Sequence, residues 1–183
     1  GSAHPGGAGQ GRMQKSLLIA DVSRAFFEAP ARRDLCVELP EEALSAREFP
    51  QEVVGKLKAS LYGTRDASMN WQEEVAKCMT QWGFRTCKFN PCLYMHPSRE
   101  MMCLVHGDDF VCVSGSANLV WLKEQLSESF EIKTKLMGLG AGESREERIL
   151  NRVIRVAEDG WEYEADQRHA DLIIQETGAS KLN

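Results

Sequence analysis

The sequence of 183 residues contains no long apolar run, and this absence excludes whole classes of protein. A membrane-spanning helix needs about 20 consecutive apolar residues, and a signal peptide needs an apolar stretch near the N-terminus. Residues 1–12 are rich in glycine and carry no such stretch. We therefore expect no membrane association and treat residues 1–12 as a disordered tail or a cloning remnant. Residues 13–183 are expected to form one domain.

The cysteine pattern lacks the paired motifs of zinc sites and disulfide-rich scaffolds. The six cysteines include no CxxC pair, and no Cys/His pair at zinc-site spacing follows the nearest two, Cys87 and Cys92. A chain of this size can bury a core without disulfides. We expect free thiols, several of them buried as small apolar side chains, in an intracellular, reducing compartment.

Positive charge is also scarce. The chain has 22 Lys and Arg against 27 Asp and Glu, which gives a net charge of −5. Taken alone, this balance argues against nucleic-acid binding, because phosphate contacts need Lys and Arg. A mildly basic region is predicted to be a solvated face, with nucleic-acid contact as the alternative. It comprises Lys123, Lys133, Lys135, Arg145, Arg148, Arg152 and Arg155.

The sequence does show the mixture of strand-like and helical apolar patterns that is typical of an α+β protein. Alternating or short apolar runs predict strands at 16–22, 35–39, 92–96, 131–136, 148–156 and 161–163. Helical spacing predicts helices at 23–29, 67–82, 116–130 and 165–177. Residues 101–114 predict a tight hairpin, and 41–50 and 138–147 predict loops. Asp66 and Ser116 stand where helix N-caps are expected, and the aromatic residues Trp71, Trp82, Phe84, Phe89 and Tyr94 are expected in the core.

The sharpest chemical feature is the acidic pair Asp108-Asp109 in the predicted hairpin turn. Adjacent carboxylates between apolar strands are costly unless a cation offsets their charge. Mg²⁺ favours carboxylate oxygens, and two ions about 4 Å apart serve phosphoryl transfer when a further carboxylate joins them. Asp21, at the end of an apolar run, has the character of that further ligand. A solvated turn is the alternative, since Asp favours turns.

Several segments occur in the order typical of copia-type retrotransposon reverse transcriptases. They are residues 21–30 (DVSRAFFEAP), 37–40 (VELP), 56–71 (KLKASLYGTRDASMNW), 83–84 (GF), 90–94 (NPCLY) and 105–110 (VHGDDF). The last segment stands in place of the family's Tyr-Val-Asp-Asp box. The chain therefore resembles the palm region of such an enzyme over nearly all of residues 16–178. This resemblance implies a polymerase palm-like antiparallel sheet with helices packed on one face.

The resemblance also implies a reaction. Asp21, Asp108 and Asp109 correspond to the family's three catalytic carboxylates, and the backbone carbonyl of Val22 would complete a site for two Mg²⁺ or Mn²⁺ ions. The expected partners are an RNA or DNA template with a DNA primer, and deoxynucleoside triphosphates. The expected activity is nucleotidyl transfer to the primer 3′-hydroxyl, as in an RNA-directed DNA polymerase.

Further residues fall where the family contacts its substrates. Phe26 matches the position that screens the sugar 2′ position, although a core aromatic on a short helix is an equal alternative. Tyr62, Gly63 and Arg65 match contacts to the incoming nucleotide and template. The segment from Ile149 through Leu150 and Asn151 to Arg152 resembles the hairpin that holds the primer end, with a plain core strand as the alternative. His106 and Gly107 would also lie near the primer, and for His106 the alternative is a strand-end histidine without such a role.

The departures from the family pattern lie around the carboxylates. His106-Gly107 replaces Tyr-Val, Asn151-Arg152 replaces a Gly, Ser68 replaces a Pro, and Asp66 replaces a Gln. An acid at position 66 is expected to repel phosphate. Only about 20 residues precede Asp21, so we expect the basic fingers, the thumb and the RNase H region to be largely missing, which would explain the acidic balance. The alternative function is an inactive, truncated or decayed retroelement fragment that retains only the palm fold.

Overall fold

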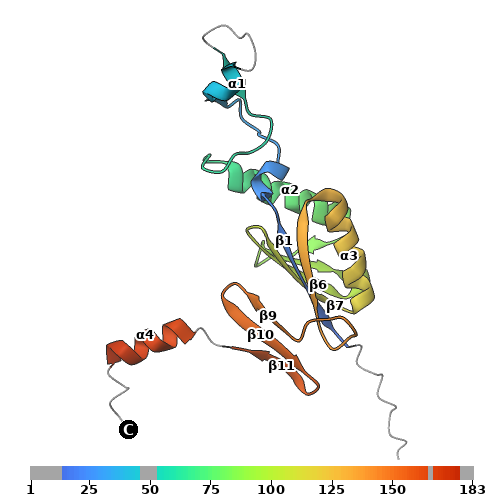
Figure 1. The fold of residues 1–183 in the computed structure, drawn as a ribbon. Coiled ribbons are helices and arrows are strands. Elements are labelled where there is room, and N and C mark those ends of the chain that lie inside the picture. The colour runs from blue at the N-terminus through green and yellow to red at the C-terminus, as the bar shows by residue number, and fades with distance from the viewer. Residues whose placement is uncertain (1–13, 46–52, 165–166, 178–183) are drawn as a thin grey trace, which may run out of the picture.

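The computed structural model describes residues 14–45, 53–164 and 167–177, and the expected tail at 1–12 lies outside them. Its centre is an antiparallel sheet of six strands in the order β4-β5-β6-β7-β1-β8 (Figure 1). The strands are β4 (Arg85–Thr86), β5 (Leu93–His96), β6 (Met101–His106), β7 (Asp109–Ser114), β1 (Ser16–Val22) and β8 (Ile132–Met137). The predicted hairpin is β6 and β7, and β1 inserts between β7 and β8. An α+β fold with antiparallel sheets is therefore confirmed.

Two helices cover one face of this sheet. They are α2 (Ala67–Gln81) and α3 (Ser116–Ser129), whose apolar residues recur at helical spacing. Alternate residues of β1, from Leu18 to Val22, point toward these helices and are at most 1% exposed. Burial of this apolar surface holds the helices to the sheet. The core here comprises Leu18, Ala20, Val22, Trp71, Val75, Phe110, Leu119, Leu122 and Leu126, among others.

A small sheet packs against the face of the main sheet that points away from the helices. The sequence predicts packing on the helix-covered face alone. The small sheet has the order β11-β10-β9, with β9 (Glu146–Ile149), β10 (Arg152–Ala157) and β11 (Gly160–Tyr163). Ile149 and Val156 pack with Leu17 and Met137 of the main sheet in a second apolar cluster. In Figure 1 these orange strands lie beyond the main sheet, on the side away from α3.

The single strand predicted at 148–156 is wrong, because the chain reverses within it. Leu150 and Asn151 both have positive φ, 47° and 64°, and they form the turn between β9 and β10. Two consecutive positive φ angles match the right-handed twist of the strands they join, and Asn tolerates this conformation. The segment is therefore a hairpin and not a plain core strand, while its contact with a primer stays a prediction.

Shorter elements flank the sheet on the side of α2. The 3₁₀ helix η1 (Ala25–Glu28) replaces the longer helix predicted at 23–29, and β2 (Cys36–Glu38) pairs with β3 (Val54–Lys56). The loop prediction for 41–50 is wrong at its start, where α1 (Glu41–Ser45) forms, and residues 46–50 lie outside the described part. A further 3₁₀ turn, η2, spans Pro97–Arg99.

The C-terminal helix α4 (Gln167–Thr177) carries an exposed apolar group. Leu172, Ile173 and Ile174 are 44%, 60% and 40% exposed, and in Figure 1 this red helix stands apart from both sheets. Of the predicted helix at 165–177, residues 165–166 lie outside the described part. Within the described ranges, no helix is both long and apolar enough to cross a membrane.

Asp66 is the N-cap residue of α2, as predicted, although its side chain makes no capping hydrogen bond. The predictions for Ser116 and Phe89 are wrong, and the N-cap of α3 is Gly115. Asp66 bonds to Arg33, while Ser116 is the first residue of α3 and its hydroxyl donates to Glu143 at 2.8 Å. Phe89 is 91% exposed and so not part of the core, because it lies in the loop between β4 and β5.

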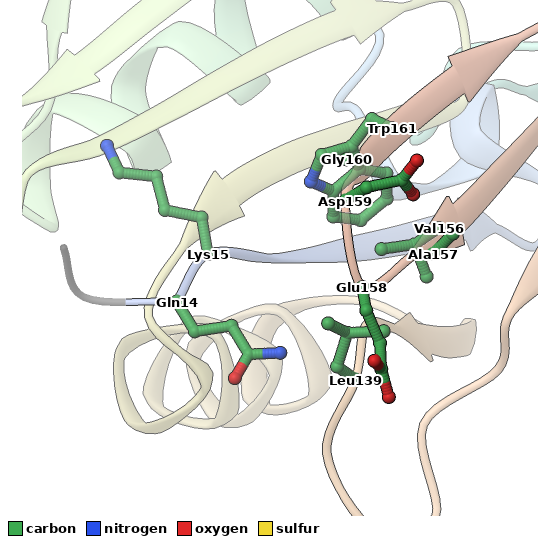
Figure 2. A pocket seen from close by; sticks show the side chains of 9 residues that line it. All are labelled: Gln14, Lys15, Leu139, Val156, Ala157, Glu158, Asp159, Gly160 and Trp161. Carbon is green, nitrogen blue, oxygen red and sulfur yellow. The ribbon is translucent and has the colours of Figure 1, made fainter.

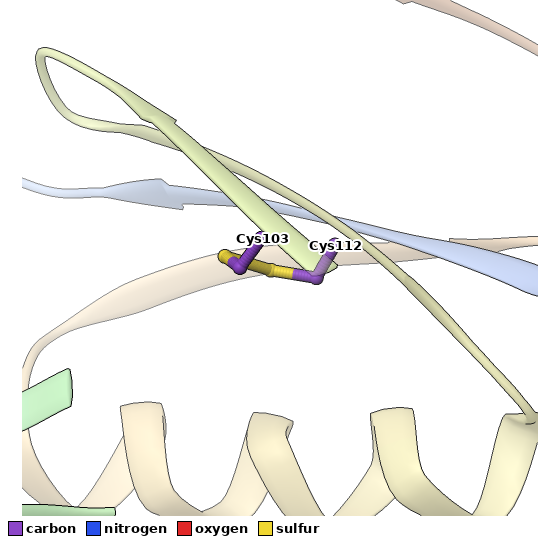
Figure 3. Close-up of a disulfide and its surroundings, with 2 residues drawn as sticks. All are labelled: Cys103 and Cys112. Atoms are coloured by element: carbon purple, nitrogen blue, oxygen red, sulfur yellow. A yellow bond between two sulfur atoms is a disulfide. The ribbon is translucent and has the colours of Figure 1, made fainter. Parts of the chain in front are cut away.

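The expectation of free thiols is wrong for two of the six cysteines. Cys103 and Cys112 form a disulfide between β6 and β7 (Figure 3). The hairpin register makes them direct cross-strand partners, with Cα atoms 4.0 Å apart, and both are fully buried. Sequence spacing alone does not reveal this pairing, because it follows from the register. Cys36, Cys78, Cys87 and Cys92 are free.

Candidate active site

The three carboxylates singled out in the sequence lie together at one end of the main sheet. Asp21, near the end of β1, is the direct cross-strand partner of Asp109, the first residue of β7. Asp108 lies in the adjacent turn, and its carbonyl accepts a hydrogen bond from the Val22 N–H at 3.0 Å. Because side chains alternate along a strand, Asp21 lies on the face away from the helices. Antiparallel pairing thus brings together residues far apart in the chain.

The electrostatics of this end of the sheet are those of crowded acids. Burial raises the pKa of the Asp109 carboxyl, and the negative charges of Asp108 and Asp21 raise it further, while His106 acts in the opposite direction. The ionised form of Asp109 therefore carries a cost that a nearby cation would offset. Burial of Asp109, and secondly its repulsion by Asp108 and Asp21, is the observation by which the chemistry of these side chains is compatible with a divalent cation.

The carboxylates gather without forming a closed cage. Among the described residues, no group of three or more His, Cys, Asp and Glu side chains is arranged to hold a metal ion. Mg²⁺ does not need such a cage, because it is commonly bound through one or two carboxylates together with water and substrate phosphates. The carboxylates therefore form an open group and not a closed metal cage.

A histidine and a lysine stand at the two ends of the acidic row formed by Asp109 and Asp21. His106 on β6 pairs with Asp109, and Lys133 on β8 pairs with Asp21, so the row runs across four neighbouring strands. Direct partners share a face of the sheet. Lys133 is exposed, and among the described residues no ion pair involves it, whereas Lys135 bonds to Glu147 at 2.6 Å. Sequence reasoning placed Lys133 only in a general basic region, because its position opposite Asp21 depends on strand register.

Two aromatic rings that the sequence singled out separately are in contact. Phe26 on η1 and Tyr62, in the loop before α2, have ring centroids 4.4 Å apart, and Phe27 also approaches Tyr62 at 5.6 Å. The Ser60 N–H donates to the Ala29 carbonyl at 2.8 Å, which fastens the two loops together. Phe26 is partly buried against the core, as its core interpretation predicts, while Tyr62 is 48% exposed. The role of Phe26 at the nucleotide sugar stays a prediction.

The neighbouring residues Gly63 and Arg65 are exposed on the loop that leads into α2. Gly63 has φ of +88°, a conformation that glycine adopts without strain. The loop thus presents Tyr62, Gly63 and Arg65 on one short exposed stretch.

Asp66 is not a free negative charge, contrary to expectation. It accepts hydrogen bonds from Arg33 Nε at 2.9 Å and from Nη2 at 2.8 Å. The Arg33 guanidinium lowers the pKa of the Asp66 carboxyl to about 2, so Asp66 is ionised but paired. Sequence reasoning missed Arg33, which lies 33 positions away and carries no motif of its own.

The residues expected at the primer end belong to different sheets. His106 and Gly107 border the carboxylates, whereas Leu150, Asn151 and Arg152 belong to the β9–β10 hairpin of the small sheet. Arg152 lies over the Tyr163 ring, with 5.6 Å between the guanidinium carbon and the ring centroid. The structure therefore provides two separate groups of candidate primer contacts.

A pocket of about 700 Å³ lies elsewhere, beside the β10–β11 turn (Figure 2). Lys15, Leu139 and Trp161 are among its lining residues, and none of the residues singled out by the sequence takes part. Because Asp21, Asp108 and Asp109 are not among its lining residues, this pocket is not part of the candidate active site.

Comparison with known proteins decides the family. The family model described as "Reverse transcriptase (RNA-dependent DNA polymerase)" matches residues 10–139, which include all three carboxylates. This chain belongs to the reverse transcriptase family. Within it the chain is of the copia type found in LTR retrotransposons: it is 29% identical over 117 residues to the "Retrovirus-related Pol polyprotein from transposon TNT 1-94" of Nicotiana tabacum.

That match covers 62% of this reverse transcriptase chain and 9% of the tobacco polyprotein, so the chain spans a small part of its relative. The family match ends before the β9–β10 hairpin. The carboxylate row and the aromatic pair thus lie inside the matched region, and the second group of candidate primer contacts lies outside it.

Proposed function

We propose that residues 13–183 are the palm domain of an RNA-directed DNA polymerase that extends a DNA primer on an RNA or DNA template. The observation that carries this proposal is the register that pairs Asp21 with Asp109 beside Asp108. Three carboxylates on one end of an antiparallel sheet, in a chain of the reverse transcriptase family, support a catalytic role for them. The substrates would be deoxynucleoside triphosphates.

Asp21, Asp108, Asp109 and the Val22 carbonyl would hold two Mg²⁺ or Mn²⁺ ions. When bound, such ions supply Lewis acidity for the primer hydroxyl and for the leaving phosphate oxygen. The raised pKa of Asp109 supports this assignment, because burial and the neighbouring carboxylates Asp108 and Asp21 make its ionised form costly, and a cation would offset that cost. The protein's own contribution is to hold three acidic side chains in place before substrate arrives.

The other candidate contacts divide by position. The contacting, tilted rings of Phe26 and Tyr62 would form the wall that screens the nucleotide sugar, with Gly63 and Arg65 beside the triphosphate and template. His106 and Gly107 would approach the primer end from the main sheet. Leu150, Asn151 and Arg152 would contact the primer from the small sheet, as exposed or partly exposed residues of a hairpin.

Primer extension tests the catalytic assignment. The full chain is given a DNA primer on an RNA template with Mg²⁺ or Mn²⁺ and compared with Asp108→Asn. The matched control is Asp159→Asn, which alters an exposed aspartate in a different hairpin turn. We expect incorporation by the unaltered chain and by Asp159→Asn, and at least a hundredfold less by Asp108→Asn. Equal incorporation with and without the Asp108 carboxylate would exclude the proposed site.

A second candidate is a folded but inactive retroelement fragment. The replacement of Tyr-Val by His106-Gly107 beside the carboxylates favours it. No incorporation by the unaltered chain, together with Mn²⁺ binding that depends on Asp108, would support this second candidate. In that case the site would have kept its metal ligands and lost its use of the primer.

A further inference from the structure

The turn that carries Asp108 has two possible backbone forms, and the structure shows one of them. His106 and Asp109 are paired, so Gly107 and Asp108 are the two residues of a tight hairpin loop. Gly107 has φ of +63°, whereas Asp108 is not among the residues with positive φ. Positive φ at the first loop residue alone defines a type II′ turn, and positive φ at both residues defines type I′.

This sequence is compatible with both forms. Glycine adopts positive φ freely, and the space where a Cβ would stand at Gly107 is open. Aspartate tolerates the left-handed conformation better than most residues do. The two turns differ by a rotation of the peptide between Gly107 and Asp108, and that rotation changes the direction in which the Asp108 side chain leaves the backbone. The Gly-Asp sequence does not by itself select one direction.

A side chain from another element bonds to that peptide. The indole Nε1–H of Trp71, on α2, donates to the carbonyl oxygen of Gly107 at 2.7 Å. Trp71 is 2% exposed, and its ring meets Phe130 edge to face at 5.2 Å between centroids, so the donor is fixed by packing. A rotated peptide would point its carbonyl away from this donor and leave a buried N–H without a partner.

The peptide on the other side of Asp108 is held as well. Its carbonyl accepts the hydrogen bond from the Val22 N–H of β1 at 3.0 Å. The two peptide groups that flank the Asp108 Cα are therefore bonded to α2 and to β1, the strand that carries Asp21. These two bonds hold the backbone on both sides of Asp108, one of them to the strand that carries Asp21.

We propose that Trp71 is a positioning residue for Asp108, because its indole N–H selects the turn form that directs the Asp108 carboxylate toward the metal site. The effect on metal binding rests on the proposed function, whereas the effect on the turn rests on the hydrogen bond between Trp71 and Gly107. Trp71 acts through the backbone of Gly107 and does not itself touch substrate. Loss of the indole N–H would leave the core packed but the turn free to adopt both forms.

The test compares Trp71→Phe with Trp82→Phe in the full chain. Both tryptophans meet the Phe130 ring, at 5.2 Å and 6.5 Å, and no hydrogen bond joins the Trp82 indole to another described residue. The first readout is the amide NMR signal of ¹⁵N-labelled Asp108. We expect it to shift or double in Trp71→Phe and to stay unchanged in Trp82→Phe. An unchanged Asp108 signal in Trp71→Phe would overturn the proposal.

The second readout is Mn²⁺ affinity, measured from the paramagnetic resonance signal of the free ion. Partners that orient metal ligands typically change affinity 10- to 100-fold. We expect at least tenfold weaker binding in Trp71→Phe, less than a twofold change in Trp82→Phe, and no site in Asp108→Asn. Unaltered affinity in Trp71→Phe would overturn the positioning role. Absence of Mn²⁺ binding even in the unaltered chain would instead overturn the proposed metal site, while the NMR result would still decide what Trp71 does.

Thermal unfolding shows whether Trp71→Phe folds. If it does not, replacement of Trp71 by β-(3-benzothienyl)alanine keeps the ring shape and removes only the N–H donor. The same two readouts then apply, with the same results expected and the same results contradicting the proposal.

Discussion

Asp66 is a single residue whose charge contributes to stability over a defined pH range. Its pairing with Arg33 lowers its pKa in the folded chain to about 2, from 3.8. The folded chain therefore binds this proton less well than the unfolded chain, and the pair stabilises the fold above pH 3.8. This contribution decreases as the pH falls from 3.8 to about 2.

We expect Asp66→Asn to lower the melting temperature at pH 7, and the difference from the unaltered chain to shrink below pH 3.8 and to vanish only below a pH of about 2. Thermal unfolding across this range measures it. Asp34→Asn is the matched control, because Asp34 also pairs with a cation, Lys56, but its side chain is 86% exposed and such pairs contribute little. A difference that stays constant down to pH 2 would show that the charge of Asp66 is not the cause.

Asp109 has the opposite effect on stability. Burial and the charges of Asp108 and Asp21 raise its pKa, so its folded form binds a proton more readily than its unfolded form. Ionised Asp109 thus destabilises the metal-free fold at neutral pH, and this cost disappears as the pH falls below the pKa of the unfolded chain, 3.8. Sites built for a ligand commonly carry such a cost without it.

Asp109→Asn should therefore raise the melting temperature at pH 7 in the presence of a chelator, and the gain should be absent at pH 3. Asp159→Asn, on an exposed turn, should change neither value. The unaltered chain should in turn gain more stability from Mn²⁺ than Asp109→Asn does, because the ion offsets the same repulsion. A lower melting temperature for Asp109→Asn at pH 7 would contradict this account.

At the scale of elements, strong periodicity is what the sequence makes visible. The strand at 16–22, the hairpin at 101–114 and the helices over 67–82 and 116–130 are long, regular runs, and the structure confirms them with shifts of one or two residues. The elements that were missed are short, such as β4 with two residues and α1 with five. Elements of this length contain too few residues to show a period.

The break between β9 and β10 was hidden for a different reason. Residues 148–156 have the mixed apolar and polar pattern of one strand, and the reversal depends on positive φ at Leu150 and Asn151. Leucine rarely adopts positive φ, so a turn at Leu150 could not be predicted from the residue type. Only the resemblance to a primer-holding hairpin pointed to it.

The disulfide within the β6–β7 hairpin allows a prediction about this element. Under non-reducing conditions, alkylation of the unfolded chain should label four cysteines, and after reduction it should label six. Since the bond closes a loop with a sequence separation of 9, reduction should lower the free energy of unfolding by about 2–3 kcal/mol. Thermal or urea unfolding with and without reductant measures the change. Six labelled cysteines without reductant would show that the pair is not oxidised in solution.

At the scale of the whole molecule, the candidate site consists of contacts that no local pattern contains. The Asp21–Asp109 register, the Arg33–Asp66 pair and the Trp71–Gly107 hydrogen bond each join separate elements. Residue types and family resemblance identified the carboxylates, because their chemistry is carried by the side chains themselves. Arg33, Lys133 and the role of Trp71 emerge only from the tertiary arrangement.

Net charge and local charge also lead to different expectations for nucleic acid. The chain is acidic overall, at −5, yet the exposed side chain of Lys133 stands at the end of the acidic row. We expect weak, salt-sensitive binding to a primer–template duplex, because overall repulsion lowers affinity while local cations still displace counterions. Fluorescence anisotropy with a labelled duplex, from low to moderate salt, measures both affinity and its salt dependence.

If Lys133 contacts a phosphate, Lys133→Gln should weaken binding at low salt and reduce the slope of log affinity against log salt by about 1. Lys123→Gln is the control, because Lys123 is exposed on α3, the helix that covers the opposite face of the sheet. Both variants remove one positive charge, so a general charge effect would change them equally. If only Lys133→Gln weakens binding, nucleic acid lies on the carboxylate side of the sheet. If both variants weaken binding equally, overall charge alone explains the affinity.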